Sequence, residues 1–124
     1  SQFKFKLEPI LNIRRGRRDQ CRQIMAEILR RDAELVAEKE RVIQMRLEQL
    51  QQLRDLNAGG EVNIDAAAAR RFFAGQLTAT LAHLDRQREL VAGQLDLCRK
   101  ALMKADQDVK AIENMKDKQQ EEFQ

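Results

Sequence analysis

The stretch Asn57–Asp65, with the sequence NAGGEVNID, is the place where turn-forming residues interrupt two long helical patterns. Gly59 and Gly60 can adopt the positive φ of a left-handed helix cap. Asn63 or Asp65 offers a side-chain oxygen to the first N–H groups of a following helix, and we place that cap at Asp65. Because so short a connection makes the second helix fold back along the first, the stretch predicts an all-α, long two-helix antiparallel coiled-coil hairpin.

The composition is typical of long exposed helices. Of the 124 residues 35% are charged and 43% hydrophobic, the five aromatic residues are all Phe, and there is a single Pro. We expect one domain over residues 1–124, with a first helix over about 8–57, a turn over 58–65 and a second helix over about 66–122. There is no run of about 18 apolar residues and no secretory signal, so we expect a cytoplasmic protein without direct membrane insertion.

The first residues allow two interpretations. Phe3, Phe5 and Leu7 alternate with polar residues, which on pattern alone is compatible with a short strand. Pro9 fits the first turn of a helix, where a missing N–H has no acceptor to lose. We expect the first helix to begin between Phe5 and Pro9.

Heptad spacing runs along the first helix and predicts a seam between two helices. One apolar column is Cys21, Ile28, Leu35 and Val42. A second column, one residue further on, is Leu29, Val36, Ile43 and Leu50. The positions that flank the first column include both apolar and charged residues: Met25, Asp32, Lys39, Arg46 and Leu53. Long Lys and Arg stems can lie along an apolar seam with their charges in water, so these interruptions are compatible with a coiled coil.

The second helix has a cleaner seam. With Leu77 assigned to heptad position d, residues at a and d follow alternating spacings of four and three over about six heptads. They are Leu77, Leu81, Leu84, Arg88, Val91, Leu95, Cys98, Leu102, Ala105, Val109, Ile112, Lys116, Gln119 and Phe123. A turn centred near residue 61 then pairs the two helices antiparallel.

No residues suggest catalysis, a metal or a cofactor. The antiparallel register brings Cys21 close to Cys98, and in a chain without a secretory signal a reduced pair is favoured over a disulfide. His83 falls at an outward position with no second ligand at metal-binding spacing. The sequence has no Cys-x-x-Cys, phosphate-binding Gly loop or nucleophile elbow. We therefore predict a protein that is not an enzyme.

Apolar residues near the turn exceed what one two-helix seam can cover, and surplus apolar surface often marks a partner site. Ile43, Leu50 and Phe73 are favoured as a docking patch. For Leu47 and Phe72 two interpretations stay open: they belong to that patch, or they close the tip of the hairpin on itself.

The other end of the hairpin is basic. Between Ser1 and Arg31 there are nine basic residues and three acidic ones. The core of this cluster is Arg14, Arg15, Arg17, Arg18 and Arg22. It is either a solvated helix face or a surface for nucleic acid, an anionic membrane or an acidic protein. Nucleic acid is the weakest of these because no aromatic residue is interleaved with the arginines.

The opening motif resembles a known family. Residues 3–14 read F-x-F-x-L-x-x-I-L-x-I-R, followed by a basic helix, a Gly-containing turn and a second helix that begins with the pair Phe72 and Phe73. This arrangement resembles the flagellar export protein FliJ over essentially the whole chain. Members of that family continue beyond a segment such as Lys116–Phe123, so the resemblance implies a truncated carboxyl end.

The resemblance implies a stalk of the type III export apparatus, similar in shape to the γ subunit of rotary ATPases. The open end would enter the ring of the export ATPase hexamer through the arginine cluster. The other end would engage the export gate protein FlhA and the chaperones of late substrates at the cytoplasmic face of the membrane. The implied gate-facing residues are Ile43, Leu50, Phe73, Leu77 and Leu84.

Two other functions are compatible with the same residues. One is a free-standing coiled-coil chaperone or a homodimeric scaffold that pairs through the column from Leu29 to Leu50. The other, less favoured, is a basic coiled coil that binds nucleic acid, for which affinity should fall steeply with added salt.

Overall fold

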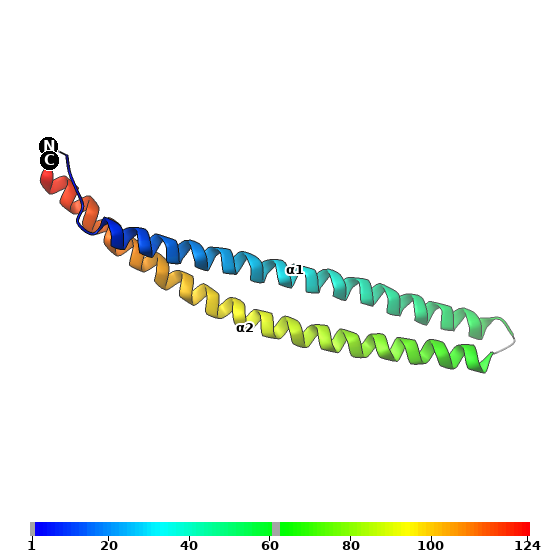
Figure 1. The fold of residues 1–124 in the computed structure, drawn as a ribbon. Coiled ribbons are helices and arrows are strands. Elements are labelled where there is room, and N and C mark those ends of the chain that lie inside the picture. The colour runs from blue at the N-terminus through cyan, green and yellow to red at the C-terminus, as the bar shows by residue number, and fades with distance from the viewer. Residues whose placement is uncertain (1, 61–62) are drawn as a thin grey trace. The chain divides into compact units, whose positions relative to one another are not determined.

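The computed structural model describes residues 2–60 and 63–124 and confirms the predicted all-α hairpin. Helix α1 spans Glu8–Ala58 and helix α2 spans Ile64–Phe123, packed antiparallel, and no strand occurs in the described ranges (Figure 1). The chain divides into two compact units. The terminal unit comprises Ser1–Leu29 and Gly93–Gln124, and the turn unit comprises Arg30–Ala92.

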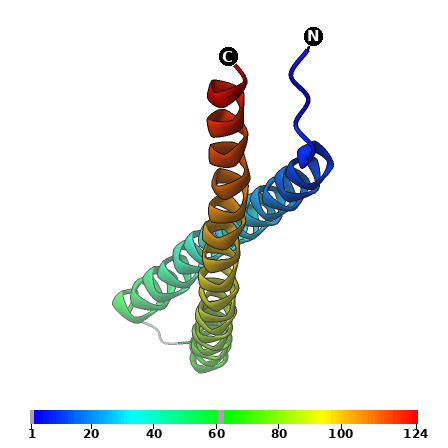
Figure 2. The ribbon, with the colours of Figure 1, turned by 90° about the vertical axis from the view of Figure 1, so that its left-hand side faces the viewer.

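The N-terminal segment is not helical before Glu8, and its apolar alternation does not mark a strand. Residues 2–7 instead run beside the last turns of α2 within the terminal unit (Figure 2). The Leu7 carbonyl accepts the N–H of Leu11 at 2.9 Å, which closes the first turn of α1. Pro9 lies in that turn, where its missing N–H costs nothing.

The turn uses the expected glycine but a different cap. Gly60 has φ +82°, the left-handed conformation predicted for this stretch. The cap predicted at Asp65 is wrong, because α2 begins at Ile64 and Asn63 precedes it. Asn63 Oδ1 accepts the N–H of Ala66 at 3.1 Å, which satisfies an amide in the first helical turn that has no intrahelical acceptor. Glu61 and Val62, in the middle of the quoted stretch, lie outside the described residues.

The predicted seam of α2 is buried for most of its length. The buried members are Leu77, Leu84, Val91, Cys98, Val109 and Ile112. Gln119 and Phe123, at the end of the series, are exposed. The reason is that α1 begins at Glu8 and leaves the last turns of α2 without a facing helix.

In α1 the two apolar columns differ in burial. Leu35 and Val42 of the first column are buried, so this column occupies the d positions of the seam. Leu29 and Val36 of the second column are 47% and 45% exposed, because the second column lies at the neighbouring e positions. We call the surface formed by e positions of both helices and the adjacent b positions the e flank. The opposite surface, formed by g positions and the adjacent c positions, is the g flank.

Charged side chains occupy part of the seam in the turn unit. Arg88 Nε donates to Asp32 Oδ1 at 3.1 Å, and Lys39 Nζ lies 2.7 Å from Asp85 Oδ1. The hydrogen bond to Asp32, and then its negative charge, raise the pKa of Arg88 above its ordinary value. Polar pairs at seam positions favour one register over others, because a shift by one heptad would separate them.

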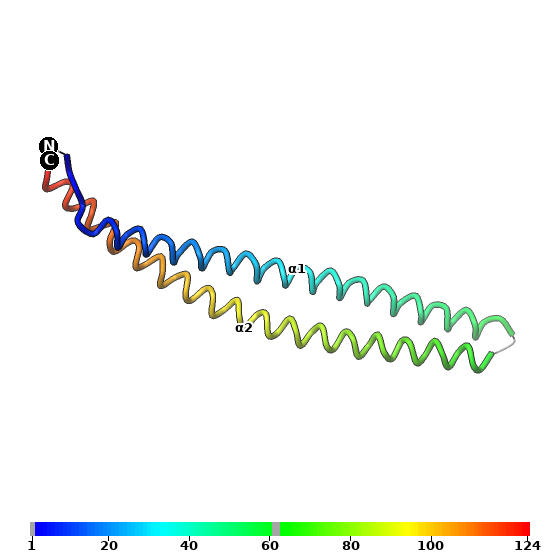
Figure 3. Tube along the Cα trace, in the orientation of Figure 1, coloured from blue at the N-terminus to red at the C-terminus, as the bar shows by residue number. Residues whose placement is uncertain are grey.

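Neither helix is interrupted by its glycines (Figure 3). Gly16 lies inside α1, and a Cβ added there would meet nothing within 4 Å. Ala would therefore fit at this position.

Candidate partner-binding surfaces

The opening motif builds a small apolar core in the terminal unit. Phe5 and Leu11 are buried with Val109 and Ile112 of α2, and Phe3 and Leu7 pack against this cluster. The ring of Phe3 lies 5.6 Å, centroid to centroid, from that of Phe123. The motif thus ties residues 2–7 to the last turns of α2. Its remaining apolar members, Ile10 and Ile13, are exposed, and they are available to a partner.

Two arginines of the basic cluster are engaged on the e flank. Arg15 Nη2 donates to Glu113 Oε2 at 3.1 Å, and Arg22 Nη2 lies 3.7 Å from Asp106 Oδ1. All four residues stand at e positions, so these contacts join e positions of α1 to e positions of α2. The side chains are partly exposed, and such pairs contribute little stability once water and salt screen them. Their consequence is that these two arginines already have acidic partners.

The other three arginines differ from one another. Arg14 Nη1 donates to the Asp108 carbonyl at 3.0 Å across the seam. Arg18 contacts Asp19, the next residue, at 3.3 Å. Arg17 is exposed at a g position and makes no ion pair with the described residues. The structure therefore divides the predicted cluster between two flanks and leaves Arg17 the most available cation.

A groove lies on the g flank of the terminal unit. It has a volume of about 320 Å³. It is lined by Arg14, Arg17, Gln20, Cys21, Ala101, Lys104, Ala105 and Asp108. The small side chains among these lie in or beside the seam, which explains why the surface is hollow here. A signal for this face is present in the sequence beyond the predicted arginine cluster: Ile10, Ile13, Arg17, Gln20 and Ile24 repeat with heptad spacing, each one residue before a seam position.

The apolar residues near the turn do not form one patch. Ile43 and Leu50 are half-buried at e positions, whereas Phe73 is partly exposed at a g position of α2. Phe72 is 69% exposed and Leu47 is 50% exposed, so neither closes the tip of the hairpin.

Leu77 and Leu84 do not lie on a surface. Both are buried at d positions of α2, in the seam with α1. Their assignment to a gate-facing surface is therefore corrected: their burial follows from the same heptad pattern that predicted the seam, and a partner cannot reach them while the helices stay paired.

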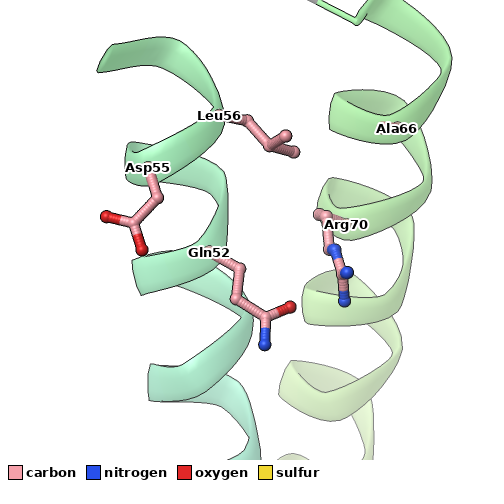
Figure 4. A pocket seen from close by; sticks show the side chains of 5 residues that line it. All are labelled: Gln52, Asp55, Leu56, Ala66 and Arg70. Carbon is pink, nitrogen blue, oxygen red and sulfur yellow. The ribbon is translucent and has the colours of Figure 1, made fainter. Parts of the chain in front are cut away.

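The tip of the turn unit has two shallow depressions. One is lined by Gln52, Asp55, Leu56, Ala66 and Arg70. In this depression Leu56 points towards α2, while Asp55 points away from it (Figure 4). The other lies on α1 alone and is lined by Leu47, Glu48, Leu50, Gln51 and Arg54. Both are open to solvent, and their lining groups do not converge as a small-molecule site requires.

The two cysteines lie close together across the seam, as the register predicted. Cys98 Sγ lies 3.5 Å from the Cys21 carbonyl oxygen, and both cysteines are free. His83 is exposed. Within residues 2–60 and 63–124, no three His, Cys, Asp or Glu side chains form a group that could hold a metal ion.

Comparison with protein families bears on these surfaces. The family model described as "Flagellar FliJ protein" matches residues 3–124. The chain belongs to the FliJ family. Members of this family are non-catalytic components of flagellar protein export. Membership in the family therefore connects the chain with flagellum biogenesis and type III export. Comparison with the curated proteins and with the solved structures gives no match. Over the described residues, neither helix has a stretch that is apolar and long enough to cross a membrane.

Proposed function

We propose that this chain is a coiled-coil stalk that docks in the ring of the export ATPase through its terminal unit and links that ring to the export gate and substrate chaperones. The proposal rests on a combination of features in the terminal unit. It combines a core made by the opening motif with exposed isoleucines and an available arginine on the same unit. A surface of this kind suits an acidic, partly apolar protein partner.

The proposed mechanism needs no catalytic group in the chain. A helical hairpin that contacts some subunits of a ring can bias their nucleotide states when it binds one state more tightly than another. The coupling is reciprocal, so the nucleotide bound in the ring also changes the affinity for the stalk.

The gate and chaperone contacts belong to the turn unit in this proposal. Ile43, Leu50 and Phe73 remain the candidate residues, on two flanks rather than one face. Two flanks allow two partners to be held at once, one beside Ile43 and Leu50 and the other beside Phe73.

The test is the ATPase rate of the cognate export ATPase with and without this protein. We expect the protein to raise the rate and to promote ring assembly, and we expect a variant with Arg14, Arg17 and Arg18 changed to Glu to do neither. Circular dichroism of the variant shows whether it remains helical. An active ATPase whose rate and assembly are unchanged by the wild-type protein would refute the stalk.

A homodimeric scaffold is the second candidate, because Leu29 and Val36 are nearly half exposed along one column of α1. It requires a dimer at micromolar concentration that dissociates when Val36 is changed to Lys. Size-exclusion chromatography with light scattering measures this directly, and a monomeric wild-type protein would exclude it.

A further inference from the structure

We infer that the g flank of the terminal unit, centred on Ile13, Arg17 and Lys104, is the face that docks onto the export ATPase, and that it accepts an acidic, partly apolar protein surface. This inference rests on the proposed stalk function. It assigns the docking to one flank, because Arg15 and Arg22 on the other flank already face acidic residues.

The first argument is the distribution of apolar side chains. Eight large apolar residues are exposed in the terminal unit, and five of them stand at g or c positions. These five are Ile10, Ile13, Ile24, Leu97 and Met115. The other three are Leu29 at an e position, Met103 at a b position, and Phe123, which contacts Phe3. Burial of apolar area is the main favourable term in protein association, so the g flank has more to gain from a partner.

The second argument is shape and charge. The groove on this flank is lined by three cationic side chains, Arg14, Arg17 and Lys104, and by one carboxylate, Asp108. Arg17 and Lys104 have no ion-pair partner among the described residues. A partner side chain that enters the groove therefore meets positive charge above small residues such as Ala101. Carboxylates beside an apolar side chain complement this arrangement.

The third argument is the contrast with the e flank. Two of its cations, Arg15 and Arg22, lie against Glu113 and Asp106, so a partner that contacted these two arginines would have to compete with existing contacts. A partner gains little by binding an arginine that already has an ion pair, because the existing pair must first be broken. An arginine without an ion pair can form a new one when the partner docks.

The experiment compares matched substitutions on the two flanks, with binding to the cognate export ATPase measured by fluorescence anisotropy of the labelled full chain. Arg17→Glu on the g flank is matched by Arg99→Glu on the e flank, the same charge change at an exposed site. Ile13→Gln is matched by Met103→Gln, since these side chains are 58% and 62% exposed. Circular dichroism checks that all four variants keep the helicity of the wild type.

We expect both g-flank substitutions to weaken binding by about tenfold and both e-flank substitutions to change it by less than about twofold. The loss from Arg17→Glu should shrink between low and high salt because screening weakens the charge term, whereas the loss from Ile13→Gln should persist.

Equal losses on both flanks, or losses confined to the e flank, would overturn this inference while leaving the stalk function intact. Failure of the wild-type protein to bind the ATPase would overturn the stalk function, and the inference with it.

Two further measurements test whether another partner occupies the groove. If Arg17→Glu abolishes binding to phosphatidylglycerol vesicles but leaves ATPase affinity unchanged, the groove serves a membrane. If Ile13→Gln dissolves a dimer seen by light scattering and leaves ATPase affinity unchanged, the groove serves a second copy.

Discussion

A substitution at Leu11 tests whether the opening motif stabilises the fold. Its side chain is fully buried, with 0% exposure, in a cluster with Phe5, Val109 and Ile112. Leu11→Ala removes the side chain at the centre of this cluster and leaves the helix propensity of α1 nearly unchanged. The perturbation therefore acts on packing between α1, the N-terminal segment and α2.

The expected cost follows from the burial. Leu→Ala at buried sites costs about 2–5 kcal/mol, and the value depends on how far the surroundings collapse into the space left behind. One wall of this cluster is the non-helical segment that carries Phe3 and Phe5, which can move inward more easily than a helix. We therefore expect about 2–3 kcal/mol. At a urea m-value of about 2 kcal/mol/M, this lowers the unfolding midpoint by roughly 1–1.5 M.

The matched control is Ile13→Ala, two residues away on the same helix and 58% exposed. It should change the free energy of unfolding by less than about 0.5 kcal/mol. Urea titration followed by circular dichroism at 222 nm compares the two variants with the wild type. Amide hydrogen exchange locates the effect, which should concentrate in residues 2–29 and 93–124 and spare the turn unit.

Equal stability of the two variants would refute this reasoning, since it would mean that the burial of Leu11 contributes nothing. Exchange that speeds up only in the turn unit would do the same, because the affected contacts all lie in the terminal unit.

Three further outcomes are expected. Gly16→Ala should stabilise the protein by up to about 1 kcal/mol and raise the melting temperature, because the added methyl group meets nothing within 4 Å; a lower melting temperature would contradict this. Asn63→Ala should cost about 1 kcal/mol in urea titration through loss of the α2 cap, whereas Asp65→Ala should cost less, and the reverse order would restore the original cap assignment. A short bis-thiol crosslinker should join Cys21 to Cys98 within one chain, visible as a faster band on a non-reducing gel that Cys98→Ser removes; crosslinking only between chains would show that the seam has another register.

The sequence alone determined the local structure and the pairing of the helices. Helix propensity, the glycine turn and the heptad spacing all act over a few residues, so the two helices, the left-handed Gly60 and the proximity of the cysteines could be read directly. The seam of α2 was predictable for the same reason, because a sustained a/d repeat permits only one face to be buried.

Only the tertiary structure decided what each residue next to the seam does. Leu29 and Leu35 have similar side chains and both follow a seven-residue spacing, yet one is nearly half exposed and the other buried, because burial depends on the facing helix. The arginine cluster is continuous in sequence, but Arg15 and Arg17 project from opposite flanks, and only Arg15 meets an acidic residue of α2. Helix propensity and heptad spacing specify the helices and the seam between them. Which residue of the other helix an individual side chain beside the seam contacts is a long-range matter that no local pattern encodes.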